Sequence, residues 1–207
     1  MIVEPDIETC SEDRLLAALT EQMNGPKWLG EMRGLARKRF ADLGFPTTRD
    51  EDWRFTNVSP LKELEFSAAE TDPSAQLEGC LFGSLEGPRL VFVNGFYSAE
   101  LSHVGELPNG VQVSSVAKAL AQYESVFKNH LTHRDTDAFA ALNTACFTDG
   151  AFVRVPNGVA METPIRIYYL STAGDGAIAN IRSLIVVGEN SQATVVESWS
   201  GRDTKYF

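Results

Sequence analysis

The chain has 207 residues, of which 43% are hydrophobic, and this is enough for one sizeable core or two small ones. Asp and Glu number 28 against 18 Lys and Arg, which gives a formal net charge of −10. Because such an acidic surface repels phosphate backbones, we expect no nucleic-acid partner.

The same sequence indicates a cytoplasmic protein without membrane contact. No stretch approaches the ~20 apolar residues that a membrane span needs. The start of the chain, residues 1 to 6, is acidic and lacks the basic start and apolar run of a signal peptide. The three cysteines, Cys10, Cys80 and Cys146, are odd in number and widely spaced, unlike a disulfide framework.

The first region, residues 1 to 66, is predicted to be helical. Thr9 and Glu12 have the spacing of a capping box ahead of an apolar stripe. Pro26 suits the first turn of a second helix, and Gly44 is a natural stop for it. The apolar residues expected to share one helical face are Leu15, Leu16, Leu19 and Met23 in the first helix, and Trp28, Leu29, Met32, Leu35, Ala36 and Phe40 in the second.

The second region, residues 67 to 149, is predicted to mix strands and helices in a connecting α/β region. Asn94-Gly95 is a strong hairpin signal between two short apolar runs. The expected elements are a strand at 90–93 that returns through 96–97, a strand around 111–113, a helix carrying Val116, Leu120, Tyr123 and Phe127, and a helix at about 136–146 with Phe139 and Leu142 inward.

The third region, residues 150 to 207, is predicted to contain only strands and turns. The segments 155–158 and 187–190 look like equivalent corners that lie 32 residues apart. Such spacing is what stacked β-coils show, although the residues alone rank a β-sandwich equally with a β-helix. The expected strands cover 152–155, 165–170, 184–187 and 193–199.

The segment 45–57 is the most informative in the chain. It places a proline before a run of acid, tryptophan, base, aromatic and threonine, and it is too charged for a core. This run resembles the N-terminal signature of the SufD branch of the SufB/SufD family, scaffold proteins of the SUF iron–sulfur cluster assembly machinery. The resemblance covers roughly residues 25 to 207, and further landmarks follow in matching order at 90–95, 142–145, 149–150 and 188–194.

The resemblance implies a mainly β fold with α-helices. A helical N-terminal region would precede a right-handed β-helix-like core of the SufBD type, truncated here to its first coils. It further implies a scaffold that is not an enzyme, within a SufBCD-type complex that contains a SufB-like paralogue and a SufC-like ATPase. The iron–sulfur cluster would be assembled by that complex, with no cofactor held by this chain.

Family members are much longer than this chain, and their functional cysteine, histidine and ATPase-binding helices would follow Phe207. We therefore assign no catalytic, cofactor-binding or metal-binding residue. Strands stacked in coils need a cap, and an open edge carries unpaired N–H and C=O groups. We accordingly expect homodimers or aggregates that form through residues 181 to 207.

The second region contains the most specific signal for an alternative function, a metal-binding site. His130 and His133 lie three apart, with Asp135 next and Cys146 further on. On a helix such a pair could converge on one ion, but a structural zinc site needs a fourth ligand that the sequence does not align. A solvated loop is therefore preferred. The cysteines are isolated, so they are not expected to hold a cluster, and Cys146 is expected to be a small buried hydrophobe.

The charged run at 51–55 has two interpretations. In the structural one, Trp53 and Phe55 anchor the helical segment onto the next domain. In the other, the run contacts a partner, since Trp and Arg are enriched at binding hot spots. The basic residues expected on the solvated face of their helix are Arg33, Arg37, Lys38 and Arg39.

Two other function classes remain open. The chain has no Gly-x-Ser-x-Gly elbow and no phosphate loop, which argues against nucleophilic catalysis and ATP hydrolysis. A sugar-active or sugar-binding β-helix protein would need clustered carboxylates on neighbouring strands. An orphan structural interaction module is the other alternative. The acids of the strand region are separated by long intervals: Glu162, Asp175, Glu189, Glu197 and Asp203.

Overall fold

The computed structural model contains two compact units. Unit 1 extends to Ala68 and also includes residues 135–146, while unit 2 contains residues 69–134 and 147–207. The domain boundaries expected at residues 66 and 149 stay a prediction. The residues that the structure describes are 15–17, 19, 25–77, 84–131, 137–174 and 176–201.

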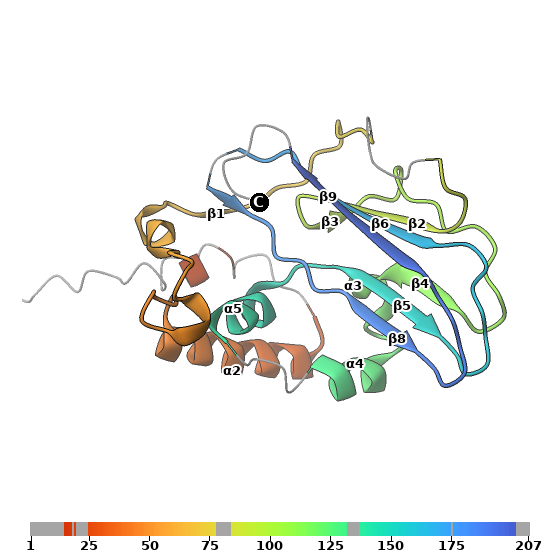
Figure 1. Cartoon of the computed structure of the whole chain (residues 1–207), viewed down its shortest axis with the longest axis horizontal. Coiled ribbons are helices and arrows are strands. Elements are labelled where there is room, and N and C mark those ends of the chain that lie inside the picture. Colours follow the sequence, from red (N-terminus) through yellow and green to blue (C-terminus); the bar gives the residue numbers. More distant parts are fainter. Residues whose placement is uncertain are drawn as a thin grey trace, which may run out of the picture. The chain divides into compact units, whose positions relative to one another are not determined.

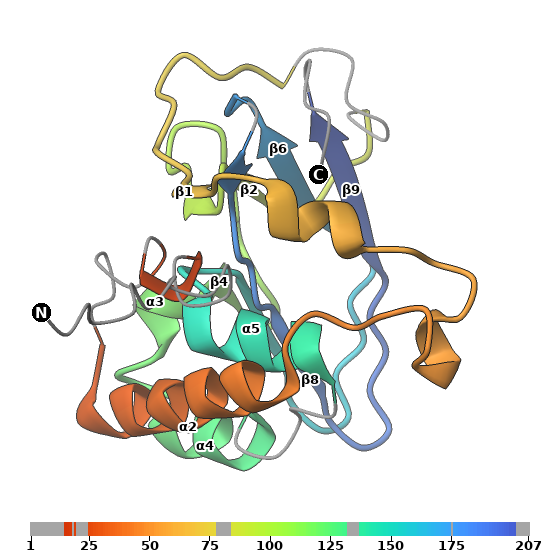
Figure 2. The ribbon, with the colours of Figure 1, turned by 90° about the vertical axis from the view of Figure 1, so that its left-hand side faces the viewer.

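Unit 1 is organised around helix α2 (Lys27–Leu43), which is preceded by Pro26. At its end, Gly44 adopts a φ of 62° and donates its N–H to the carbonyl of Phe40 at 2.7 Å, so the expected glycine stop is confirmed. Helix α5 (Ala138–Cys146) packs against α2, as Figure 2 shows. The unit also contains the 3₁₀ turns η1 (Glu51–Trp53) and η2 (Ser59–Glu63) and the short strand β1 (Ser67–Ala68).

The face of α2 that packs inward differs from the expected one. Leu29, Ala36 and Phe40 are buried as predicted, whereas Leu35 is 73% exposed. Six residues after Leu29, Leu35 lies about a third of a turn away from the buried row. Arg33 was expected on the solvated face and is buried instead, because it follows Leu29 by four residues and falls in that row.

The helical stripe upstream of α2 is confirmed where the structure describes it. Leu15, Leu16 and Leu19 are helical and buried. These leucines therefore belong to a packed face, as their spacing predicts. The remaining members of the stripe and of its capping box, Thr9, Glu12 and Met23, lie outside the described residues.

Unit 2 is built from two sheets, which Figure 1 shows as two layers. The first sheet has the order β3-β2-β6-β9 and the second has the order β4-β5-β8. β2, β6 and β9 run parallel, as do β5 and β8, while β3 and β4 pair antiparallel with their neighbours. The strands of the two sheets are β2 (Arg89–Val93), β3 (Phe96–Tyr97), β4 (Gln112–Ser115), β5 (Ala151–Val155), β6 (Ile165–Ser171), β8 (Leu184–Val187) and β9 (Val195–Gly201), and the short strand β7 (Ala177–Ile178) belongs to neither.

The predicted hairpin joins β2 to β3. Asn94 and Gly95 have φ values of 51° and 89°, which a two-residue hairpin turn of type I′ requires. The buried Asn94 side chain donates from Nδ2 to the carbonyl of Glu70 at 2.9 Å and accepts at Oδ1 from the N–H of Thr172 at 2.8 Å. This asparagine therefore ties the turn to the loop that follows β6.

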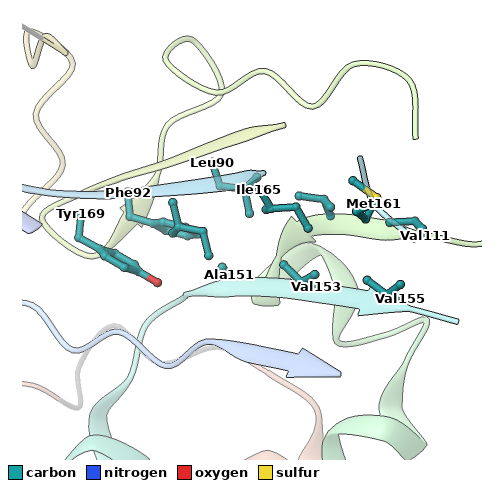
Figure 3. Packing of buried hydrophobic residues seen from close by; sticks show 11 residues of the cluster. Leu90, Phe92, Val111, Ala151, Val153, Val155, Met161, Ile165 and Tyr169 are labelled. Carbon is teal, nitrogen blue, oxygen red and sulfur yellow. The ribbon is translucent and has the colours of Figure 1, made fainter. Parts of the chain in front are cut away.

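The main hydrophobic core lies between the two sheets (Figure 3). Strands β2 and β6 are buried on both faces, because a second cluster of Val91, Val93, Tyr168 and Leu170 covers the other side. This explains why these strands are continuous apolar runs rather than alternating ones. The core between the sheets consists of Leu90, Phe92, Val111, Val113, Ala151, Val153, Val155, Met161, Ile165, Ile167 and Tyr169.

Helices α3 (Val116–Ala119) and α4 (Glu124–Leu131) lie beside the second sheet (Figure 1). The sequence predicted one helix here, and the structure contains two that are separated by a short turn. Tyr123 and Phe127 nevertheless both pack on Phe152 of β5, with ring centroids 5.0 Å apart in each case. The spacing thus identified the side chains that face the sheet, although the helix itself is interrupted.

From β5 onward the chain alternates between the two sheets through β5, β6, β8 and β9, with the short strand β7 between β6 and β8 outside both sheets. Val155 pairs with Val187, which confirms the predicted correspondence of the two corners. Asn157 Oδ1 accepts from the N–H of Glu189 at 3.0 Å, so the corners are stacked on each other. A Cβ added to Gly188 would approach the backbone nitrogen of Asn157 to 2.6 Å, and this contact requires glycine.

The described residues therefore form a mixed α/β structure with open sheets. The parallel pairing of β2, β6 and β9 does not fit an immunoglobulin-like sandwich, whose sheets are antiparallel. The right-handed β-helix-like core implied by the resemblance stays a prediction. None of the helices in the described ranges is long and apolar enough to cross a membrane.

Candidate functional site

The candidate site is an exposed row of apolar side chains on the outermost strands of unit 2. Ile185, Val187 and Trp199 are 39%, 46% and 56% exposed, respectively. Each of the three pairs, in the parallel register, with a buried core residue on the neighbouring strand. Together they form the exposed end of the core between the sheets. We call Ile185, Val187 and Trp199 the open core end. Their register partners on β5 and β6 are Val153, Val155 and Tyr169.

A ladder of aromatic rings leads to the open core end. Phe92, Tyr169 and Trp199 occupy matched positions on β2, β6 and β9. The ring centroids are 5.6 Å apart between Phe92 and Tyr169 and 4.0 Å apart between Tyr169 and Trp199, and both pairs are stacked. Each such pair contributes about 0.5–1.5 kcal/mol beyond area burial. The ladder thus holds the Trp199 ring in place while more than half of it stays exposed.

Polar groups accompany the apolar row. The hydroxyl of Tyr169 lies 2.7 Å from Ser183 Oγ and donates to Glu197 Oε1 at 2.9 Å. Burial raises the pKa of Tyr169 above its ordinary value, and the neighbouring Glu197 charge acts in the same direction. Tyr169 is therefore a protonated donor at neutral pH, and it fixes the Glu197 carboxylate beside the open core end.

This arrangement suits contact with another backbone segment. β8 and β9 are the outermost of the described strands in their sheets, and an outer strand presents one row of N–H and C=O groups. Strand addition uses such a row for affinity and uses neighbouring apolar positions for specificity. Within the described ranges, no group of three or more His, Cys, Asp or Glu side chains could hold a metal ion.

The residues considered for a metal site are placed separately. His130 is exposed in the last turn of α4, in unit 2. Cys146 is buried at the end of α5, in unit 1. His133 and Asp135 lie outside the described residues. A solvated position is thus confirmed for His130 and a buried one for Cys146, and the expected lack of a metal ligand stays a prediction.

Cys146 is unsuited to nucleophilic chemistry. Burial raises the pKa of its thiol to about 11, against a smaller opposing effect of the Arg37 and Arg33 charges. Burial also lowers the pKa of Arg33. Since the thiolate is the reactive form, Cys146 is inert at neutral pH. The other two cysteines lie outside the described residues.

The charged run behaves differently at its two aromatic positions. Trp53 packs against Phe139 of α5, with ring centroids 5.0 Å apart, so its packing role is confirmed, although Phe139 belongs to the same unit rather than to the next domain. Phe55 was expected to anchor the segment and instead is 88% exposed. The guanidinium carbon of Arg54 lies 4.6 Å from the centre of the Phe55 ring. The structural interpretation is therefore wrong for Phe55.

The acids of the strand region are dispersed where they can be described. Glu162 and Glu189 are exposed, and Glu197 is engaged by Tyr169. Asp175 and Asp203 lie outside the described residues. Sequence reasoning expected an open edge within residues 181 to 207 but did not identify the contacts among Tyr169, Ser183, Glu197 and Trp199. The signal that could have found the aromatic pair was the recurrence of a large ring at equivalent places in β6 and β9.

Comparison with known proteins places the chain in a family. The family described as SufBD protein N-terminal region matches residues 17–167. The iron–sulfur cluster assembly SufBD family protein of Synechocystis is 33% identical over 202 residues, which cover 93% of this chain and 44% of the relative. SufD of Bacillus subtilis is 28% identical over 203 residues, covering 91% and 45%, and SufB of the same organism is 33% identical over 199 residues, covering 88% and 42%.

The chain spans less than half the length of these curated relatives. The relatives include both SufD and SufB, so the matches do not separate the two branches. The family match nevertheless covers more than half of the chain and includes segments of both units. The chain therefore belongs to the SufBD family.

Proposed function

We propose that this chain is the N-terminal part of a scaffold subunit in SUF iron–sulfur cluster assembly and that it is not an enzyme. The observation that carries the proposal is the SufBD match over residues 17–167. Relatives whose names refer to iron–sulfur cluster assembly support it. The cluster is the cargo of the complex, and no residue of this chain is assigned as its ligand. A cytoplasmic location belongs to the same proposal.

The finer assignment within the family is a SufD-like role. Its support is the acid, tryptophan, base, aromatic and threonine run at 51–56, which resembles the SufD signature. The identities of 28% to SufD and 33% to SufB of Bacillus subtilis do not decide between the branches. The proposal therefore rests on this run rather than on overall identity.

We further propose that β5, β6, β8 and β9 begin a right-handed β-helix-like core. The alternation of these strands between two sheets supports this reading, as does the stacking of Asn157 on the corner at Glu189. Parallel bridges from Asp149 to Ile181 and from Ala160 to Gln192 extend the same register outside the named strands. In such a core a neighbouring strand layer, supplied here by a partner, would cover the open core end, which accounts for its apolar character.

The proposed partners are a SufB-like paralogue and a SufC-like ATPase. The exposed backbone row of β8 and β9, together with the open core end, gives a SufB-like partner a surface for strand-to-strand contact. The sequence has no phosphate loop, so ATP hydrolysis in the complex would come from the ATPase. A homodimer through residues 181–207 is the competing arrangement, and residues 202–207 lie outside the described ones.

Co-expression with the SufB-like and SufC-like proteins of the same source tests this function. We expect the tagged chain to retain the SufB-like protein through size-exclusion chromatography. Trp199→Asp should abolish retention, because it places a charge on the open core end. Leu85→Asp is the matched control, since Leu85 is an exposed apolar residue outside the strands of the open core end, and it should leave retention unchanged.

Three outcomes would count against the proposal. The wild-type chain could fail to retain the SufB-like protein, which would remove the assembly role. Both variants could retain it equally, which would show that the open core end is not the contact. Both variants could lose it equally, which would show a general effect of surface charge. Circular dichroism of each variant establishes that the loss of binding is not a loss of folding.

A further inference from the structure

Four asparagines of the chain are each followed by glycine: Asn24, Asn94, Asn109 and Asn157. In such a pair the backbone nitrogen of the glycine can attack the carboxamide carbon of the asparagine, because glycine has no Cβ to hinder the approach. Asparagine accordingly counts among the thermolabile residues. The attack needs an available glycine N–H and a carboxamide that can turn toward it. Asn24 lies outside the described residues, and the structure describes the other three pairs.

Two of the described pairs have the same local sequence. The segments Pro108-Asn109-Gly110-Val111 and Pro156-Asn157-Gly158-Val159 are identical tetrapeptides. In both segments the asparagine and the glycine are exposed. Neither the neighbouring residues nor exposure therefore distinguishes the two asparagines, and any difference in their reactivity comes from hydrogen bonding in the folded chain.

The reacting groups at Asn157 are both held by the stacked corner. Asn157 Oδ1 accepts from the N–H of Glu189 at 3.0 Å. The attacking nitrogen, that of Gly158, donates its N–H to the carbonyl of Glu189 at 2.9 Å. Reaction at Asn157 thus requires the opening of two hydrogen bonds to one residue, which is a local unfolding event.

The Asn94 carboxamide is fixed as well. Asn94 is buried, its Nδ2 donates to the carbonyl of Glu70 at 2.9 Å, and its Oδ1 accepts from the N–H of Thr172 at 2.8 Å. Both ends of the carboxamide are therefore engaged. Asn94 must also open locally before its side chain can turn.

The reacting groups at Asn109 are free. The turn is closed by the N–H of Val111, which donates to the carbonyl of Pro108 at 3.0 Å. Gly110 has a φ of 80°, which suits glycine in such a turn. Among the residues that the structure describes, no hydrogen bond engages the Asn109 side chain or the N–H of Gly110. Asn109 needs no local opening to react.

We propose that Asn109 is a site of spontaneous deamidation in the folded protein, with water as the co-reactant. The Gly110 nitrogen loses its proton and forms a bond to Cγ of Asn109, and the amide nitrogen of Asn109 takes up a proton and leaves as ammonia. One water molecule then hydrolyses either carbonyl–nitrogen bond of the succinimide and gives aspartate or isoaspartate. No electrons are transferred. The proposal does not depend on the role in cluster assembly.

The product changes the turn that leads into β4. Isoaspartate lengthens the main chain by one methylene and leaves a free carboxylate beside it. A Cβ added to Gly110 would lie 3.1 Å from Pro156 Cγ, so the turn packs closely on the chain after β5. The adjacent Val111 and Val155 both belong to the core between the sheets (Figure 3). Isoaspartate at position 109 should therefore lower the melting temperature, whereas aspartate keeps the main-chain length and should not.

Peptide mapping by mass spectrometry tests the site in the full chain, incubated in warm, mildly alkaline buffer with and without urea. In urea, Asn109 and Asn157 should deamidate at the same rate, because their local sequences are identical. Folding should slow Asn94 and Asn157 at least tenfold, since at least two hydrogen bonds must open at each. Folding should slow Asn109 less than about threefold. Labelling by an isoaspartyl methyltransferase distinguishes isoaspartate from aspartate.

Gly188→Ala provides a matched perturbation of the protected pair. A Cβ at Gly188 would approach the Asn157 backbone nitrogen to 2.6 Å, so the added methyl group should separate Asn157 from Glu189. Deamidation at Asn157 should then rise toward its rate in urea, while that at Asn109 should stay unchanged. Circular dichroism establishes that the variant is still folded. Asn109→Ser should remove the fastest site and leave the rates at the other two as they are.

Specific results would overturn the proposal. One is folded wild-type protein in which Asn157 deamidates as fast as Asn109, since hydrogen bonding would then not control the reaction. Another is folding that slows Asn109 as much as Asn157, which would show that the Gly110 N–H or the Asn109 carboxamide is held. None of these results bears on whether the chain retains a SufB-like protein, so this test and that of the proposed function fail separately.

Discussion

Replacing Asn94 should destabilise unit 2 through two separable effects. The side chain makes four hydrogen bonds: Nδ2 donates to Glu70 O at 2.9 Å and to Thr172 Oγ1 at 3.1 Å, and Oδ1 accepts from the N–H groups of Thr172 at 2.8 Å and Ala173 at 3.2 Å. The residue also has a φ of 51°, which is strained for most side chains. Asn94→Ala removes the bonds and keeps the strain, whereas Asn94→Gly removes both.

The magnitudes follow from the number of bonds and the backbone conformation. A net contribution of about 1 kcal/mol for each hydrogen bond gives at most roughly 4 kcal/mol for Asn94→Ala, since Glu70 is exposed and Thr172 and Ala173 are only partly buried, so that water can replace some of the bonds. The left-handed conformation costs a non-glycine residue about 1–2 kcal/mol, so Asn94→Gly should cost about 1 kcal/mol less than the alanine variant. Asn190 has a similar φ of 53° but is exposed, so Asn190→Ala, which keeps the same backbone strain and removes no buried hydrogen bond, should cost less than about 1 kcal/mol.

Urea unfolding followed by circular dichroism measures these differences, and hydrogen exchange reports on the amides of Thr172 and Ala173 in unit 2. These two amides should exchange faster in both Asn94 variants and should be unchanged in Asn190→Ala. Costs below about 1 kcal/mol for both Asn94 variants would refute the hydrogen-bond reasoning. A glycine variant that is less stable than the alanine variant would refute the strain reasoning.

Three further predictions concern packing, close approach and ionisation. Phe152→Ala should lower the unfolding free energy by about 3–5 kcal/mol, measured in urea, because it empties a fully buried site under Phe127; a loss under about 1 kcal/mol would contradict this packing. Gly188→Ala should cost about 1–3 kcal/mol in thermal unfolding, since its methyl group meets the Asn157 backbone, and a neutral result would mean that the corners are not stacked. The Cys146 thiol has its pKa raised to about 11, so the stability linked to its burial is complete below the ordinary value of 9.0 and is lost as pH rises through about 11. Peptide mapping should find native Cys146 unmodified by iodoacetamide at pH 8, and rapid labelling would disprove its burial.

Features that depend on a few neighbouring residues could be predicted from the sequence. The stop at Gly44 and the turn at Asn94-Gly95 require a left-handed backbone, and residues suited to that backbone mark these positions. The correspondence of Val155 with Val187 was also visible, because two corners with similar composition recur at a fixed interval. In each case the physical requirement is local and the residue types that satisfy it are few.

Features that depend on a distant partner could not be predicted. The buried face of α2 is set by α5, so the periodicity of α2 alone did not reveal that Arg33 faces inward and Leu35 outward. An open edge was expected within residues 181 to 207, but its apolar row of Ile185, Val187 and Trp199 was not identified, because exposure of Trp199 depends on which strands lie beside β9. The aromatic run at 51–55 was recognised, yet only the three-dimensional structure separates the packed Trp53 from the exposed Phe55.

The packing of α5 against α2 has a consequence for folding during synthesis. The two helices are separated by roughly 100 residues, and closing a loop of that length costs about 4 kcal/mol of chain entropy. Strand β4 likewise has no pairing partner until β5 has been synthesised, and β5 follows α5 in the sequence. Neither unit is therefore complete until the ribosome has released the segment through β5, and the apolar face of α2 remains without its partner helix until then. A nascent chain of this protein should accordingly depend on chaperones at least until β5 has left the ribosome.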